Sequence, residues 1–293
     1  MLILLFKLFF RRVKAGEKPG YPRFKGKGWY DSITYLQSGF SLNSNILGLS
    51  KIGDIKIKLH RPFEGNIKRL TVKRTSTGKW FVSILTDFDY YTPLKHSDKS
   101  VGIDVGILSF ATLSNGTYIP NPRFYIQEEK ALAKANRRFS KTEMGTLERK
   151  KCLKTLCRVH ERIANKRENF TQKLSKNLVD HYGIICFEDL NIKNMSRNHN
   201  LAKHILDAAW SKLVTYTSYK AENAGRKVVL VDPKNTSKMC SNCGMLVEKD
   251  LSERTHNCPF CGLSIDRDLN ASINILRLGL QSGRKTGRCP SLQ

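Results

Sequence analysis

Four cysteines near the C-terminus constrain this chain more than any other feature of its sequence. They form two Cys-x-x-Cys pairs separated by a loop of fourteen residues: Cys240 with Cys243, and Cys258 with Cys261. A glycine follows each pair and allows the backbone to turn tightly around a bound ion. Four thiolates at this spacing are the closed tetrahedral ligand set of a structural zinc site. The spacing therefore predicts a zinc ribbon over residues 233–262.

The chain is strongly basic, and this charge narrows the class of partner. Its 293 residues contain 51 Lys and Arg against 25 Asp and Glu, a formal net charge of +26. Such a surplus attracts polyanions and releases their counterions on binding, so we expect nucleic acid as the partner. An anionic membrane surface is the competing explanation. No long apolar segment supports it, and we expect no membrane partner.

Two further features bear on the cellular compartment. The apolar start, MLILLFKLFFRR, is too short to span a bilayer and lacks the charge order and cleavage site of a signal peptide. We interpret it as a helix that packs on another element. The remaining cysteines show no disulfide-like pattern: Cys152, Cys157, Cys186 and Cys289. Free thiols beside a zinc site indicate a reducing compartment, so we expect a cytoplasmic protein.

The first third of the chain has the pattern of a basic loop followed by β-structure. Residues 14–29 are rich in Gly, Pro and Lys, with Tyr21, Phe24 and Trp29 interleaved. This loop is either a surface on which nucleic-acid bases stack or an ordinary connector. From residue 32 to about residue 89 the pattern alternates, as in DIKIKLH, and two strands flank a Thr-Gly turn. Several short antiparallel strands predict a small barrel or sandwich.

The rest of the chain has the mixed pattern of an α/β domain. Residues 101–114 predict one long apolar strand, followed by an Asn-Gly hairpin turn. A basic helical region spans about residues 128–182, with an interruption near Gly145. The runs GIICFEDL and KVVLVD predict buried strands, and an amphipathic helix spans about residues 206–223 between them.

The second half of the basic helical region has two distinct faces. Apolar residues recur at helical spacing on one face: Leu153, Leu156, Ile163, Phe170, Leu174 and Leu178. Basic residues lie opposite them: Lys150, Lys151, Lys154, Arg158, Arg162, Lys166 and Arg167. A solvated face is the ordinary explanation for such a stripe. The charge of the whole chain favours a nucleic-acid groove instead.

Three acidic residues lie where strands or helices would fix their positions. Asp104 lies inside an apolar strand, Glu188 ends another, and Asp268 begins the helical pattern after the cysteines. Singly, these residues are equally explained as a hydrogen-bond hub, a surface group and a helix N-cap. Together, three carboxylates without a His or Cys partner favour hard cations such as magnesium. Two such ions about 4 Å apart activate water for phosphodiester hydrolysis.

Several of these motifs occur in one order that resembles the TnpB (OrfB) family. They are GIDVG, the run from HERIANKRENF to FEDL, and NTSKMCSNCG, CPFCG and DRDLNASIN. The resemblance extends from about Phe9 to Leu280. The family is encoded by insertion sequences and is considered ancestral to type V CRISPR nucleases. It implies a RuvC-like, ribonuclease-H-type mixed sheet with an inserted zinc ribbon, preceded by a small antiparallel, wedge-like β-barrel.

The resemblance also implies an activity, RNA-guided cleavage of double-stranded DNA, and assigns residues to it. Asp104, Glu188 and Asp268 match the catalytic, magnesium-binding carboxylates, whereas the neighbouring Asp266 does not. The four cysteines match the zinc ligands. Thr236, with the serine after it, matches a motif whose role stays open.

The same resemblance implies the domain organisation and the partners. The expected partners are a guide RNA from the transposon end, double-stranded target DNA and a separate transposase of the same element. The expected location of the protein is the prokaryotic cytoplasm, in association with the nucleoid. The expected segments are a helical remnant with a basic loop at 1–30, the barrel at 31–99, the nuclease at 100–232 and 263–280, the ribbon at 233–262, and a basic disordered tail at 281–293.

One departure from the family leaves two other hypotheses open. Family members carry several dozen more residues before the FFRRVKAGEKPGYPRFKG stretch, and these form most of a helical recognition domain. A shortened, catalytically incompetent DNA- or RNA-binding accessory of transposition is therefore the alternative to an active nuclease. A transposase that itself joins DNA strands ranks lower, because the motifs are those of a RuvC domain with a ribbon.

Overall fold

The computed structural model describes residues 2–18, 20–21, 30–88, 91–195, 197, 199–250 and 253–285. The chain divides into two compact units, residues 1–89 and 90–293. Most of the aromatic part of the basic loop, residues 22–29, lies outside the described residues. The end of the predicted basic tail, residues 286–293, which includes Cys289, also lies outside them.

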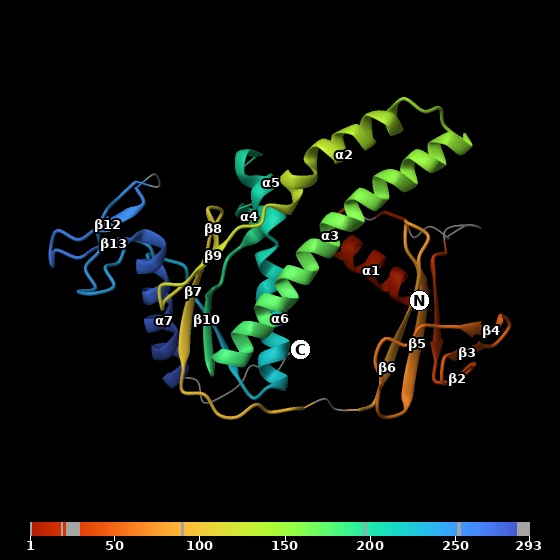
Figure 1. Cartoon of the computed structure of the whole chain (residues 1–293), viewed down its shortest axis with the longest axis horizontal. Helices are drawn as coiled ribbons and strands as arrows, with labels where there is room; N and C mark the ends of the chain where they lie inside the picture. The colour runs from red at the N-terminus through yellow and green to blue at the C-terminus, as the bar shows by residue number, and fades with distance from the viewer. Residues whose placement is uncertain are drawn as a thin grey trace. The chain divides into compact units, whose positions relative to one another are not determined.

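The described residues of the first unit form one helix and two small antiparallel sheets (Figure 1). The helix is α1, Leu2–Lys14. One sheet has the order β1-β5-β6, with strands Ser32–Leu36, Ile67–Arg74 and Trp80–Thr86. The other has the order β2-β3-β4, with strands Phe40–Asn43, Ile46–Leu49 and Gly53–Lys56. The predicted strand DIKIKLH is therefore regular only in its first part.

Alternating apolar residues build one core for these two sheets. Leu47 and Leu49 of β3 pack with Leu70 and Val72 of β5, and all four are buried. The predicted Thr-Gly turn joins β5 to β6, and Gly78 has a φ of +86° there. Short antiparallel strands with period-two burial were predicted for this region, and the structure has them.

The second unit is built on a five-stranded mixed sheet of order β11-β10-β7-β8-β9. Its strands are β7 Ser100–Val105, β8 Ser109–Leu113, β9 Tyr118–Pro120, β10 Ile184–Glu188 and β11 Lys227–Val231. Strand β10 is parallel to both β7 and β11, whereas β8 and β9 run antiparallel. The prediction of one long strand over residues 101–114 is wrong. The chain turns back after Val105, where Gly106 N donates to Phe110 O at 3.3 Å, so an unbroken apolar run concealed a hairpin.

Six helices of this unit are described. They are α2 Phe124–Ser140, α3 Leu147–His181, α4 Ile192–Met195, α5 His199–Ala208, α6 Trp210–Asn223 and α7 Arg267–Lys285. The predicted break near Gly145 is confirmed, and Thr146 caps α3 by accepting from Arg149 N at 3.2 Å. The single helix predicted over residues 206–223 is divided at Ala209, which has a φ of +57°. In the described ranges, every helix is too short or too polar to cross a membrane.

The two faces of the sheet pack against different helices (Figure 1). Val101 and Ile103 of β7 join a core that includes residues of α3, α5 and α6. The alternate residues of β7 and β10 face α7. Gly102 is one of them, and a Cβ added to it would lie 2.1 Å from Ser272 O. Glycine therefore lets α7 lie against β7 and β10 of the sheet.

Candidate metal centres and active site

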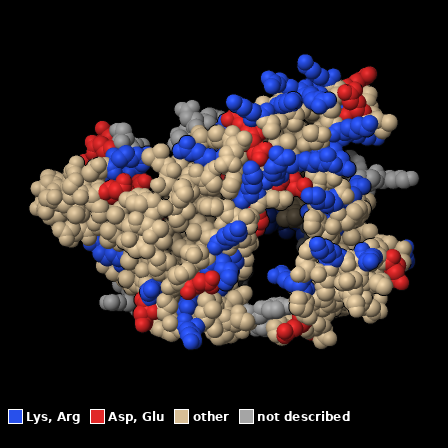
Figure 2. All heavy atoms as spheres, viewed as in Figure 1, with Lys and Arg blue, Asp and Glu red and all other residues tan. Residues whose placement is uncertain are grey.

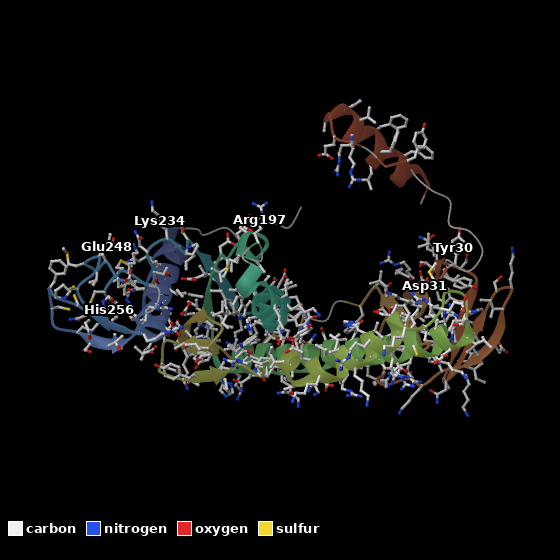
Figure 3. The ribbon with its side chains drawn as sticks, turned by 90° about the horizontal axis from the view of Figure 1, so that it is seen from above. Tyr30, Asp31, Arg197, Lys234, Glu248 and His256 are labelled. Carbon is white, nitrogen blue, oxygen red and sulfur yellow. The ribbon has the colours of Figure 1, made fainter. Side chains whose placement is uncertain are left out.

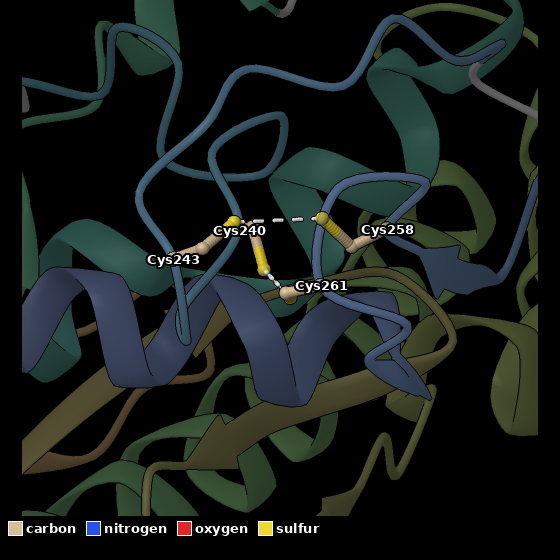
Figure 4. Close-up of side chains that lie close together, drawn as sticks. All are labelled: Cys240, Cys243, Cys258 and Cys261. Atoms are coloured by element: carbon tan, nitrogen blue, oxygen red, sulfur yellow. Dashed lines mark hydrogen bonds between the residues drawn. The ribbon is translucent and has the colours of Figure 1, made fainter.

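The structure brings the four predicted cysteines together. Their sulfur atoms all lie within 4.8 Å of one another, and Cys240 Sγ is 3.6 Å from Cys261 Sγ. Figure 4 shows the two loops presenting their sulfurs toward each other. Four thiolates around zinc, with Zn–S bonds of about 2.3 Å, require S–S separations of about 3.8 Å. The donor set and its spacing therefore fit a tetrahedral ion of this kind.

Two tight turns explain this geometry. Gly244 has a φ of +78° and donates its N–H to Cys240 O at 2.9 Å, and Gly262 has a φ of +72° and donates to Cys258 O at 2.9 Å. A side chain at either glycine would be strained, so the sequence requirement for glycine after each pair has a backbone cause. The short strands β12, Thr255–Asn257, and β13, Ser264–Asp266, pair antiparallel around the second turn.

The ribbon also has a small polar interior beside the sulfurs. His256 of β12, labelled in Figure 3, is fully buried. Lys249 Nζ donates to its Nδ1 at 2.7 Å. Burial lowers the pKa of His256, and the nearby Lys249 lowers it further. The imidazole therefore stays neutral and accepts a hydrogen bond from the lysine. This hydrogen bond contributes to the interior of the ribbon, and the group of possible metal ligands consists of the four cysteines.

The sheet register brings two of the three predicted carboxylates side by side. Strands β7 and β10 are parallel and pair Ile103 with Phe187, so Asp104 and Glu188 follow next to each other. Both alternate to the α7 side of the sheet, and Asp268 lies in the first turn of α7. Burial raises the pKa of Asp104 well above its usual value, and the nearby carboxylates of Glu188 and Asp268 raise it further. Asp104 therefore lies close enough to the other two carboxylates to be affected by their charges.

Asp266, rather than Asp268, caps helix α7. Its Oδ1 accepts from the backbone N–H groups of Asp268 and Leu269, at 3.0 Å in each case. The interpretation of Asp268 as an N-cap is therefore wrong, because the cap lies two residues earlier. Asp266 also accepts from the Tyr118 hydroxyl, whose pKa is raised by burial and by this carboxylate. Asp268 keeps its carboxylate for other partners.

Two arginines that sequence reasoning missed lie beside Asp268. Arg267 Nε is 3.5 Å and Arg254 Nη1 is 3.8 Å from Asp268 Oδ1. The Arg254 side chain is 48% exposed, so its guanidinium is open to a ligand as well. The signal in the sequence is weak, since Arg254 is one of 51 basic residues. A pocket of about 220 Å³ also opens beside Glu188.

Sequence reasoning also missed the contacts behind Glu188. The hydroxyl of Thr236, whose role was left open, donates to Glu188 Oε1 at 2.5 Å. This hydrogen bond opposes the effect of burial, which raises the pKa of Glu188. Asn270 and Asn274 of α7 are fully buried and hold the segment that contains Thr236. Their spacing of four within an apolar helical pattern was the available signal.

The predicted basic face of α3 has an unpaired stretch near the start of the helix, followed by a stretch in ion pairs. Five of its members are exposed: Lys150, Lys151, Lys154, Arg158 and Arg162. Three members contact acidic groups, because Arg162 and Lys166 pair with Glu128, and Arg167 pairs with the buried Asp207. Figure 2 shows Lys and Arg gathered over the hairpin of α2 and α3. The four exposed residues for which no ion pair is described, Lys150, Lys151, Lys154 and Arg158, are the members of this face best placed to meet a polyanion.

Two family models match the chain. The model described as "Probable transposase" (OrfB_IS605) matches residues 66–199, and the model "Cas12f1-like, TNB domain" matches residues 210–275. The second range contains the cysteine quartet, Glu188's partner Thr236, and the start of α7.

Two similar proteins carry the name "Putative RNA-guided DNA endonuclease". The relative from Streptomyces pristinaespiralis is 39% identical over 270 residues, which cover 90% of this chain and 67% of the relative. The relative from Escherichia coli K12, InsQ, is 31% identical over 314 residues, which cover 98% of this chain and 76% of the relative. Among solved structures, a Cas12f1–sgRNA–target DNA complex matches with a TM-score of 0.55 and 17% identity, over 90% of this chain and 67% of that chain. That likeness shows a shared mixed α/β fold.

Proposed function

This chain belongs to the TnpB (OrfB) family, and on that premise we propose that it is an RNA-guided DNA endonuclease. One observation carries the proposal. Asp104, Glu188 and Asp268 come from two parallel strands and one helix and lie on one side of the sheet, and the pKa of Asp104 is raised by burial and by the charges of the other two carboxylates. A fold that only binds nucleic acid has no need to place three partly buried carboxylates on one side of a sheet in a chain of net charge +26.

The three carboxylates are proposed to hold magnesium. Oxygen ligands without His or Cys are the set that this ion prefers, and bound magnesium supplies activation of water and stabilisation of the leaving oxygen. Thr236 orients Glu188, and Arg267 and Arg254 balance the charge at Asp268 and contact a phosphate. Hydrolysis forms a bond between phosphorus and the oxygen of water and breaks the P–O3′ bond. The 3′ oxygen takes a proton and leaves as a hydroxyl.

The four cysteines are proposed to hold zinc in a structural role. All four positions of a tetrahedral ion are filled by thiolates, so no position remains for a substrate. The ribbon leads directly through β13 into α7 and thus fixes the backbone on which Asp268 lies.

A guide RNA from the transposon end and double-stranded target DNA are the proposed partners, with a separate transposase of the same element. The names of the relatives and the exposed lysines of α3 support the nucleic-acid partners. The proposal also includes the prokaryotic cytoplasm as the location. It includes the domain limits given above: 1–30, 31–99, 100–232 with 263–280, 233–262 and 281–293.

The test is a cleavage assay on the full chain with the noncoding RNA adjacent to its gene. The complex should cut matching DNA only with magnesium, and Asp104→Ala should abolish the cutting. Asp180→Ala, which removes an exposed carboxylate paired with Lys176 on α3, is the matched control and should cut normally. Cutting by Asp104→Ala at the wild-type rate would show that the active site is assigned wrongly.

The same assay separates this proposal from the accessory hypothesis. Tight, salt-sensitive binding of RNA and DNA without any cleavage by the wild type would support a nucleic-acid-binding accessory instead. The chain spans 67% and 76% of the two relatives' lengths, so a gel-shift measurement belongs beside each cleavage measurement.

A further inference from the structure

A continuous set of hydrogen bonds connects the cysteine centre to the carboxylate site. Thr236 lies four residues before Cys240, and its side chain is almost fully buried. Its hydroxyl lies 2.5 Å from Glu188 Oε1 and 3.1 Å from Pro233 O. The shorter contact is charge-assisted, since the acceptor is a carboxylate, and such hydrogen bonds are the stronger class.

Two buried asparagines of α7 hold the backbone on both sides of Cys240. Asn274 Nδ2 donates to Thr236 O at 2.9 Å and to Met239 O at 2.6 Å. Asn270 Nδ2 donates to Met239 O at 2.8 Å, and its Oδ1 accepts from the N–H of the next residue after Cys240 at 2.9 Å. Both asparagines lie on the helix whose first turn contains Asp268.

We propose that Thr236 is a positioning residue for Glu188, and that the cysteine centre acts on the carboxylate site through Asn274 and Asn270. The inference rests on the proposed function, because it assumes that Glu188 binds a divalent cation. Thr236 has a β-branched side chain with few allowed rotamers, and Asn274 fixes its carbonyl. The hydroxyl therefore holds one oxygen of Glu188 and leaves the other for the cation. Partners of this kind set ligand orientation and typically change metal affinity by about 10- to 100-fold.

Manganese binding to the zinc-loaded full chain, without nucleic acid, tests the inference apart from cleavage. Thr236→Val keeps the shape and removes the hydroxyl, and we expect manganese affinity to fall by about 10-fold or more. Thr236→Ser keeps the hydroxyl and should restore affinity to within about 3-fold of the wild type. Thr217→Val is the matched control, because it removes a buried hydroxyl that donates to Leu213 O within α6. Its manganese affinity should equal that of the wild type.

Cleavage assays extend the same series. Thr236→Val should lower kcat and leave the Kd for target DNA unchanged, because the buried hydroxyl contacts Glu188 and the Pro233 carbonyl inside the protein. Unchanged manganese affinity in Thr236→Val would overturn the inference. Equal losses in Thr236→Val and Thr236→Ser, with normal Thr217→Val, would overturn it too. If the wild type binds manganese but cuts no DNA, the proposed endonuclease function is refuted. A loss of manganese affinity in Thr236→Val but not in Thr236→Ser would still support the positioning role of Thr236.

Asn274→Ala tests the link to the cysteine centre. It should retain one zinc per chain and reproduce the manganese loss of Thr236→Val, because the carbonyl of Thr236 is released. Asn270→Ala is the milder second variant, since both bonds of Asn274 remain. Wild-type manganese affinity in a folded Asn274→Ala protein would show that the ribbon does not act on Glu188.

Discussion

The ribbon and the carboxylate edge are both candidate metal centres, but the fold assembles them in different ways. The cysteines lie in two local turns whose hydrogen bonds stay within a few residues, such as Gly244 N to Cys240 O. The carboxylates come from β7, β10 and α7, so their arrangement depends on the register of parallel strands and on the packing of α7. The first centre is a property of short segments, and the second is a property of the whole unit. The two should therefore respond differently to substitution.

Loss of a cysteine should have the largest effect on stability. Structural zinc in small modules contributes an apparent ~10–16 kcal/mol to folding. Cys258→Ser should therefore release zinc and destabilise the second unit, as measured by zinc stoichiometry and thermal unfolding. Cys157→Ser, at a half-buried position on α3, should keep its zinc. A Cys258→Ser protein with normal zinc content and normal Tm would refute the ribbon.

Gly102→Ala should disturb the carboxylate edge and spare the ribbon. The added Cβ would lie 2.1 Å from Ser272 O, so α7 must move away from the sheet. Overpacking of this kind typically costs about 1–3 kcal/mol. Urea unfolding should show that loss, and cleavage should slow while zinc stays bound.

The control for this substitution is Gly116→Ala in the β8–β9 turn. That glycine has a φ of +85° and open space around it, so alanine strains the backbone without moving α7. It should lose stability but keep its cleavage rate. Equal cleavage by Gly102→Ala and the wild type would contradict the role given to the packing of α7.

Asp104→Asn should stabilise the magnesium-free protein, and increasingly so as the pH rises. The pKa of Asp104 is raised in the folded state, first by burial and then by Glu188 and Asp268, from an ordinary value of 3.8. The folded wild type thus holds a proton that the unfolded chain releases, and its stability falls as pH rises from that ordinary value through the raised one. Asparagine has no such loss. The Tm of each protein, measured between pH 4 and pH 8, gives the difference in stability. A Tm of the wild type that rises relative to that of Asp104→Asn as the pH rises would contradict this account.

The smallest effect is expected at the cap of α7. Asp266→Ala removes the acceptor for two backbone N–H groups and should cost about 1 kcal/mol. Thr146→Ala removes the cap of α3 at a similar cost. Only Asp266→Ala should also slow cleavage, because it loosens the turn that contains Asp268. Equal cleavage rates for the two variants would show that the Asp266 cap does not help to position Asp268.

The difference between the centres also explains what the sequence could predict. Four cysteines with glycines after them define a ribbon by local spacing, and the structure brings these residues together. Asp104, Glu188 and Asp268 were selected by their places at strand ends and at a helix start, and a family pattern was needed to join them. The hairpin after Val105 was missed because apolar residues continue through the turn. Thr236 and Asn274 were not recognised as a pair because their contact joins segments far apart in the chain.

The central claim is that the chemistry belongs to the carboxylates and that the ribbon serves as their support. The rate of guided DNA cleavage by zinc-loaded Asp104→Ala tests it most directly, with guide-RNA affinity and zinc content measured on the same sample. We predict a rate at least about 100-fold below that of the wild type, with unchanged RNA affinity and one zinc per chain. A rate equal to that of the wild type would contradict the account.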